Sequence, residues 1–176
     1  MSIVVRAAHA EDVSALTELY LDLFTVQYQG RPDIFREPRR DDPNESAELE
    51  RYLLSLLSAS DSALLVAQYE GRIVGFVQAA LRKIGDSGSV PFRRPCIECW
   101  VQHLAVRPDA RRKGVGRALD EGIAAWARER GATLLGLQPG SLTPLPIGST
   151  WNWDIAPEVS IFIGKYRRAA SAAEFP

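Results

Sequence analysis

The chain has 176 residues, of which 46% are hydrophobic and 24% charged, and this composition excludes wholesale disorder, a fibrous repeat and a coiled coil in favour of one compact domain. Because 21 Lys and Arg residues balance 22 Asp and Glu residues, the net charge of −1 gives no general attraction for nucleic acid. No apolar run approaches the roughly 20 residues that span a bilayer, and the N-terminus lacks the apolar stretch of a signal peptide, so we expect a cytoplasmic protein that binds neither nucleic acid nor membrane.

The N-terminal part predicts one strand followed by two helices. Ile3–Arg6 is rich in β-branched residues and indicates a short strand. Apolar residues spaced by three and four over Glu11–Gln27 indicate a helix, which the turn at Pro32 interrupts. A second helix is predicted from Glu45 to about Ser60, with Asn44 as its cap.

The middle of the chain predicts a hairpin, two further strands and a helix. Two β-rich runs flank the tight turn Glu70-Gly71, and a loop over 84–94 separates them from a strand over Cys96–Val106. After a basic turn, a helix carries apolar residues inward at Val115, Ala118, Leu119, Ile123 and Trp126. Gly131 ends that helix, and residues 133–138 predict a fifth strand.

Cys96 and Cys99 form a lone C-x-x-C. A structural zinc site needs a second pair of ligands, and the sequence has neither a second C-x-x-C nor an H-x-x-x-H. A redox pair would favour the start of a helix, whereas this one falls within a predicted strand. We therefore expect two small side chains in a reducing compartment and no metal site.

A basic turn that contains glycine separates the fourth strand from the next helix. It consists of Arg111, Arg112, Lys113, Gly114, Val115 and Gly116, and Arg117 follows it. The unpaired N–H groups at a helix start and the positive end of its dipole attract an anion, which glycine lets approach closely. A P-loop would need Gly-Lys-Ser/Thr, and a dinucleotide fingerprint would need glycine where Leu119 stands. Two interpretations remain: a site for a pyrophosphate or sugar phosphate, or an ordinary capped helix with solvated basic residues.

The string L-A-V-R-P-D-A-R-R-K-G-V-G-R-A-L, residues 104–119, resembles the acetyl-CoA signature of the GNAT superfamily of N-acyltransferases. The core of that signature is Arg/Gln-x-x-Gly-x-Gly/Ala, and it matches Arg111, Gly114 and Gly116. The order of predicted elements over about residues 3–138 is similar to that family as well. The resemblance implies an α+β fold (α/β/α), with a mixed, mostly antiparallel sheet flanked by helices.

The same resemblance implies an N-acetyltransferase that uses acetyl-CoA as cosubstrate and no metal. The acetyl group would move to a primary amine of a small molecule or protein by direct attack in a ternary complex, and a homodimer is a candidate assembly. Backbone groups around Leu104, Ala105 and Val106 would bind the pantetheine arm and thioester. The amides from Arg112 to Arg117 would hold the pyrophosphate, with Arg111, Arg112, Lys113 and Arg117 offsetting its charge.

The fourth predicted strand carries the candidate catalytic residues. Strict alternation along the fourth strand puts Glu98, Trp100, Gln102 and Leu104 on one face and His103 on the opposite face, as a packed or partly exposed residue. Bases of the family lie near the positions of Trp100 and Gln102, and neither residue accepts a proton here. Glu98 is therefore the candidate base, with a surface charge at the strand edge as the alternative, and Gln102 is the candidate for orienting the substrate.

The last 38 residues depart from the family pattern, so we divide the chain into a GNAT-like core, 1–138, and an atypical tail, 139–176. The tail lacks the tyrosine-bearing helix that serves the family as general acid, and Tyr166 has no matching context. If the gene is read one base out of frame, the codons of Trp151 to Ile155 must encode Glu-Leu-Gly and then Tyr or His, as in the family's ending. The tail is either a frameshift product or a genuine unrelated segment in which only 159–166 can form a strand. With an altered tail, the alternative function is an acetyl-CoA-binding protein with impaired or no catalysis.

Overall fold

A computed structural model describes residues 2–85, 95–137 and 160–163, the last four by their backbone. In chain order the elements are β1 (Val4–Ala7), the 3-10 turn η1 (Ala10–Asp12), α1 (Val13–Gly30), α2 (Pro43–Ser58), β2 (Ser62–Tyr69), β3 (Arg72–Ile84), β4 (Cys96–Val106), the 3-10 turn η2 (Pro108–Ala110), α3 (Val115–Glu129), β5 (Leu134–Leu137) and β6 (Ser160–Ile163). The predicted helices and strands are confirmed, and β4 has the predicted bounds. The strand expected within 159–166 is β6.

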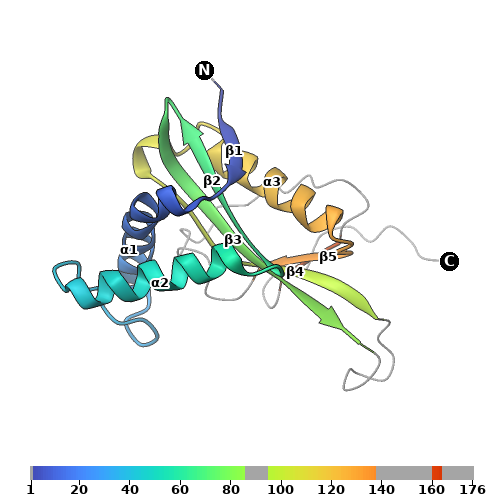
Figure 1. Ribbon diagram of the computed structural model, residues 1–176, viewed down its shortest axis with the longest axis horizontal. Coiled ribbons are helices and arrows are strands. Elements are labelled where there is room, and N and C mark those ends of the chain that lie inside the picture. The colour runs from blue at the N-terminus through green and yellow to red at the C-terminus, as the bar shows by residue number, and fades with distance from the viewer. Residues whose placement is uncertain (1, 86–94, 138–159, 164–176) are drawn as a thin grey trace.

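The described strands form one sheet in the order β1-β2-β3-β4-β5-β6. Each of the first four strands is antiparallel to the next, whereas β5 runs parallel to β4 and β6 parallel to β5. Figure 1 shows α3 on one side of this sheet and α1 with α2 on the other. The mixed, mostly antiparallel sheet between helical layers is thus confirmed.

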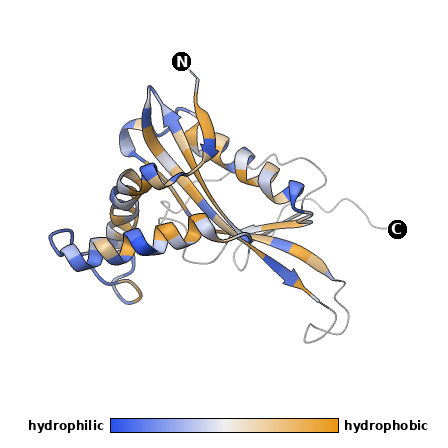
Figure 2. Ribbon diagram, in the orientation of Figure 1, coloured by the Kyte–Doolittle hydropathy of each residue, from blue (hydrophilic) through white to orange (hydrophobic). Residues whose placement is uncertain are grey.

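Each face of the sheet has its own apolar core, and Figure 2 shows the apolar strands between the helices. On the side that we call the α3 face, the core includes Val77, Cys99, Val101, Leu119 and Ile123. On the other side, the α1/α2 face, it includes Leu16, Tyr20, Leu53, Val66 and Phe76. Burying one such side chain contributes about 1.5–3 kcal/mol, so these two clusters hold the helices against the strands.

Helix α2 begins one residue earlier than the predicted cap. Asp42, and not Asn44, is the cap: its carboxylate accepts a hydrogen bond from the Asn44 backbone N–H at 3.0 Å. Pro43 occupies the first helical position, where its missing N–H costs nothing and its fixed φ is already helical. The prediction of Asn44 was wrong because it did not allow for proline inside the first turn.

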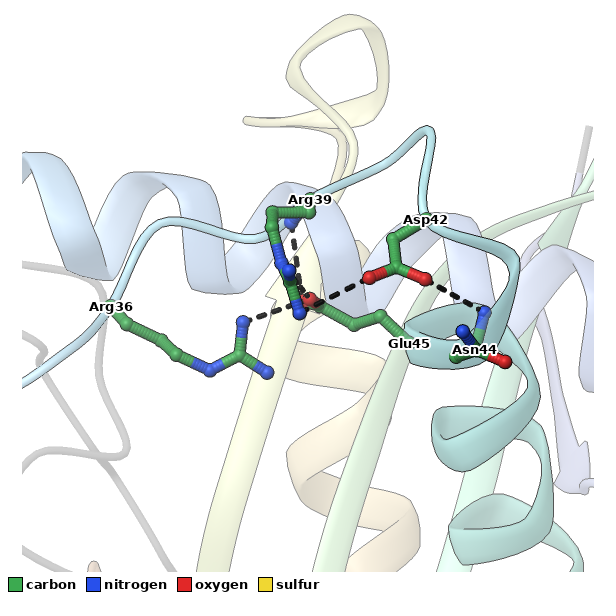
Figure 3. A network of polar contacts seen from close by, with 5 residues as sticks. All are labelled: Arg36, Arg39, Asp42, Asn44 and Glu45. Carbon is green, nitrogen blue, oxygen red and sulfur yellow. Dashed lines mark hydrogen bonds and ion pairs between the residues drawn. The ribbon is translucent and has the colours of Figure 1, made fainter.

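The segment that joins α1 to α2 is fastened to the first turn of α2 by arginines (Figure 3). Arg36 Nη1 donates to Glu45 Oε2 at 2.8 Å, while Arg39 donates to the same carboxylate through its backbone N–H at 3.2 Å and its Nε at 3.3 Å. Arg39 Nη2 also lies 3.1 Å from Asp42 Oδ2. The hydrogen bond from Arg36 is the main cause of a lowered Glu45 pKa, so this carboxylate stays charged and ties the segment to α2.

Candidate active site

A bulge in β4 determines which side chains reach each face of the sheet. Gln78 pairs with His103 and Ala79 pairs with Val101, so Gln102 is the extra residue of β4. Such a bulge breaks the two-residue alternation of a strand. Gln102 bonds to Gln78, and His103 packs on Tyr20 and Phe24 of α1, so both lie on the α1/α2 face.

Two predictions from strict alternation are therefore wrong. His103 lies on the α1/α2 face together with Gln102, and Leu104 packs against the core of the α3 face instead. The extra residue shifts the alternation by one after Gln102, so Val106 follows Leu104 to the α3 face while Ala105 packs against the core of the α1/α2 face.

In the part of the chain that the structure describes, the C-terminal half of β4 has an open backbone edge. The parallel pairing with β5 runs only from Glu98 to Val101. After the bulge residue Gln102, the four residues from His103 to Val106 pair with β3 alone among the described residues. The bulge lies where the pairing with β5 stops. The next N–H and C=O groups on that edge are thus available to a ligand, and Arg111 Nε donates to Val106 O at 3.1 Å at its far end.

The basic turn leads directly from this open edge into α3. Two of its residues adopt left-handed backbone conformations, Arg112 with φ 60° and Gly114 with φ 87°. Gly114 is the N-cap of α3 and provides no side-chain hydrogen bond to the helix start. The first N–H groups of α3 lack intrahelical acceptors by the geometry of a helix. The turn therefore presents backbone donors together with exposed cations, as an anion site requires.

A cavity of about 740 Å³ lies between the open edge, the basic turn and α1. Nine of the ten residues predicted to contact acetyl-CoA line it, namely Leu104, Ala105, Val106, Arg111, Arg112, Gly114, Val115, Gly116 and Arg117. Lys113 is not among the lining residues, and its Nζ lies 5.0 Å from the centre of the Tyr69 ring. The volume falls within the usual range of small-molecule sites.

The opposite wall of the cavity comes from α1 and from the segment after it, although the sequence did not single out the residues that contribute to it. Leu19 and Leu23 contribute apolar surface, and Asp22 and Arg40 line the cavity as well. Arg40 Nη2 donates to Asp22 Oδ1 at 2.6 Å. Both side chains are about half exposed, so the pair adds about 0–1 kcal/mol of stability. Its main effect is to place a cation across the cavity from the basic turn.

Glu98 is buried, so its interpretation as a surface charge is wrong. Only 3% of the residue is exposed, and Trp100 Nε1 donates to Glu98 Oε2 at 2.9 Å. Along a strand, the four steps from Glu98 to Gln102 correspond to about 13 Å, whereas a base acts over one hydrogen bond or one bridging water. Glu98 thus lies far from an amine held at Gln102, and its catalytic role stays a prediction.

His103 sits among aromatic rings with a buried ring nitrogen. The Tyr20 and Phe24 rings lie 5.6 and 5.5 Å from its centre, and Nδ1 has no hydrogen-bond partner among the described residues. Burial lowers the pKa of His103 from 6.5 to about 4. The imidazole is therefore neutral at physiological pH.

The C-x-x-C pair lies in β4. Both Cys96 and Cys99 are free thiols, and burial raises the pKa of Cys99 to about 12, which makes that thiol unreactive. The described part of the chain holds no cluster of three potential metal ligands and no helix that meets the length and hydropathy of a membrane span. The altered tail lies outside the described residues except for β6. The cytoplasmic location and the homodimer stay predictions.

Comparison with known proteins agrees with this geometry. The model of the acetyltransferase (GNAT) family matches residues 15–141, which is more than half of the chain and contains the open edge, the basic turn and α3. The chain belongs to the GNAT family of acetyltransferases. The family uses acetyl-CoA as cosubstrate, and the family match together with the named relatives supports an N-acetyltransferase.

Two of its similar proteins are aminoglycoside acetyltransferases. Over 127 residues the chain is 30% identical to an aminoglycoside N(6')-acetyltransferase type 1 of Stenotrophomonas maltophilia, with 72% of this chain and 69% of that protein covered. The solved aminoglycoside acetyltransferase from an uncultured soil metagenomic sample is 25% identical, with a TM-score of 0.54 and coverage of 78% and 80%. A solved acetyltransferase from Vibrio fischeri shares the fold at 19% identity, with a TM-score of 0.59 and coverage of 76% and 93%.

Proposed function

We propose that this GNAT protein transfers the acetyl group of acetyl-CoA to a primary amine of a small molecule. The proposal rests on one observation: the open β4 edge and the start of α3, which has no side-chain cap, line the same cavity. The pantetheine arm would lie along the edge at Leu104–Val106. The pyrophosphate would lie at the turn, where several amides can donate and each hydrogen bond to a charged group contributes about 1.5–3 kcal/mol.

In the reaction, the lone pair of a neutral amine attacks the thioester carbon. A C–N bond forms, the carbonyl oxygen becomes an oxyanion, and collapse of this intermediate breaks the C–S bond. A backbone N–H on the open edge of β4 would stabilise the oxyanion, an effect worth about 10²–10³ in rate in other enzymes. The amine loses one proton, and the departing CoA thiolate takes up one proton, so the overall reaction is balanced.

The amine must reach the thioester without its extra proton. An alkyl amine with a pKa near 10.4 is largely protonated at pH 7, and Gln102, near the usual position of family bases, cannot accept a proton. The neutral fraction of the amine would then react and its surplus proton would leave to water. This scheme predicts a kcat/KM that rises with pH until the substrate amine is neutral, which a pH profile measures directly.

Two measurements test the proposed function. Isothermal titration calorimetry with acetyl-CoA determines whether the cavity binds the cosubstrate. Release of CoA thiol is then followed over a panel that contains an aminoglycoside, a polyamine and a lysine peptide. The aminoglycoside is included because two of the similar proteins are named aminoglycoside acetyltransferases. We expect binding, and turnover of a small amine faster than of the peptide. An absence of binding would overturn the proposal.

A second candidate function is supported by the sequence of the tail. Residues 139–176 lack the tyrosine context that serves the family as general acid, and general acid catalysis contributes about 10²–10⁴ in rate. This candidate is an acetyl-CoA-binding protein with impaired turnover. Binding without thiol release would support it, and sequencing the gene across codons 136 to 156 would test whether the tail results from a frameshift.

A further inference from the structure

A buried polar network connects three elements beside the bulge of β4. Tyr20 of α1 donates its hydroxyl to Gln78 Oε1 at 2.6 Å. Gln78 of β3 donates through Nε2 to Tyr52 Oη of α2 at 2.8 Å and to Gln102 Oε1 of β4 at 2.8 Å. Both Tyr20 and Gln78 are almost fully buried, so satisfied hydrogen bonds are what make their burial tolerable.

The distances and the burial assign the direction of each bond. A contact of 2.6 Å is typical of O–H···O and short for N–H···O, whereas both 2.8 Å contacts suit amide donors. Burial raises the pKa of Tyr20 well above its usual value of 10, so the hydroxyl keeps its proton and donates. The Gln78 side chain thus accepts one hydrogen bond through its oxygen and donates two through its amide nitrogen.

The network consequently ends in two unused donors. The oxygen of the Gln102 side chain is already an acceptor from Gln78, which leaves the two hydrogens of its NH₂ group without a partner among the described residues. Tyr52 accepts from Gln78 in the same way, and the hydrogen of its hydroxyl also has no acceptor among the residues that the structure describes. Tyr52 is 41% exposed, and Gln102 is half-buried.

These donors lie together on the α1/α2 face of the sheet, and we place the acceptor substrate beside them. Gln102 is three residues before Ala105, which packs on the same face and lines the cavity, whereas Gln102 and Tyr52 lie outside that lining. A group that presents N–H and O–H hydrogens attracts a lone pair and repels an ammonium ion. Oxygen atoms of hydroxyl or ether groups fit this pattern, and so does the lone pair of a neutral amine.

We propose that Gln78 is a positioning residue that holds Gln102 and Tyr52 as donors to the acceptor substrate, and that this substrate is a hydroxylated amine. The inference rests on the proposed function and adds a substrate class to it. Tyr52 and Gln102 contact hydroxyl oxygens near the reacting amine. Gln78 acts through them and does not touch the substrate.

Two ring amines test this selectivity: glucosamine, which carries hydroxyl groups, and cyclohexylamine, which carries none. The measured quantity is the ratio of their kcat/KM values in the full-length enzyme. Comparing this ratio between variants cancels the difference in basicity between the two amines. Tyr52→Phe removes one donor from a partly exposed site, so the variant should fold, and we expect the ratio to fall about 5- to 10-fold, through a higher KM for glucosamine.

Gln78→Glu provides a sharper perturbation. A carboxylate at this position only accepts, so Tyr52 and the Gln102 amide turn their hydrogens inward and present oxygen atoms to the substrate. We expect the ratio to fall at least as far as in Tyr52→Phe. Tyr28→Phe is the matched control, because Tyr28 is a half-buried tyrosine of α1 outside this network, and it should leave the ratio unchanged.

Calorimetry separates the two levels of the proposal. Loss of acetyl-CoA binding in the unmodified protein would overturn the proposed function itself. Normal acetyl-CoA binding and turnover with an unchanged ratio in Tyr52→Phe would overturn only the selectivity inference. An equal loss of activity on both amines in Tyr52→Phe would also overturn it, because that result would show a structural role without preference for hydroxyl groups.

Discussion

Replacing His103 with phenylalanine should make the protein more resistant to acid. The pKa of His103 is lowered to about 4 by burial, from 6.5, so between these values the unfolded chain binds a proton that the folded protein excludes. Stability is therefore lost as the pH falls below about 6.5. The difference between the folded and unfolded pKa values lowers the free energy of unfolding by about 2 kcal/mol at pH 5 and about 3 kcal/mol at pH 4.

Phenylalanine cannot titrate, and it suits a site bounded by the Tyr20 and Phe24 rings. It also removes the unpartnered Nδ1. The quantity to compare is the difference in free energy of unfolding between His103→Phe and the parent protein. We expect this difference to grow by about 2 kcal/mol, in favour of the variant, when the pH falls from 8 to 5. Urea unfolding followed by tryptophan fluorescence measures this difference. Carboxylates such as Asp12, with its lowered pKa, affect both proteins equally. A difference that stays constant with pH would refute the reasoning.

Four further variants test other parts of the fold. Burial raises the pKa of Asp120 to about 7, so its charged form opposes folding at high pH. Asp120→Asn should therefore raise the free energy of unfolding at pH 8, by at most about 4 kcal/mol. Urea unfolding at pH 4 should show no such gain. Gly114→Ala, at φ 87°, should cost about 1–2 kcal/mol and weaken acetyl-CoA binding in calorimetry. Gly71→Ala, at φ 77° with open space around it, should cost as much stability without changing that affinity. In Gly75→Ala the new Cβ would lie 2.7 Å from Ala105 O, so β4 must shift, and we expect lower thermal stability together with weaker acetyl-CoA binding.

The parts of the site that are local in sequence could be predicted from it. The basic turn and the start of α3 follow from a few adjacent residues, because glycine at a left-handed position and free N–H groups at a helix start are local effects. The bounds of β4 follow from its hydropathy for the same reason. Nine of the ten predicted contact residues consequently meet around one cavity.

The parts that depend on tertiary contacts could not be predicted. The bulge at Gln102 reverses the orientation of His103 and Leu104, and alternation in one strand carries no signal for an extra residue. In the network around Gln78, Tyr20 lies 58 residues from Gln78 along the chain. No local sequence pattern therefore links the members of this network. Arg40 reaches the cavity wall only because α1 and its following segment fold back over β4.

The geometry of β4 separates two tasks within one strand. In the proposed function, its open backbone edge would bind the cosubstrate, while its side chains on the α1/α2 face would contact the acceptor. Backbone groups are the same for every residue type, so side chains on that face can change during evolution with little effect on the edge. A sheet of this kind can acquire a new amine specificity through substitutions at a few positions while retaining its acyl donor.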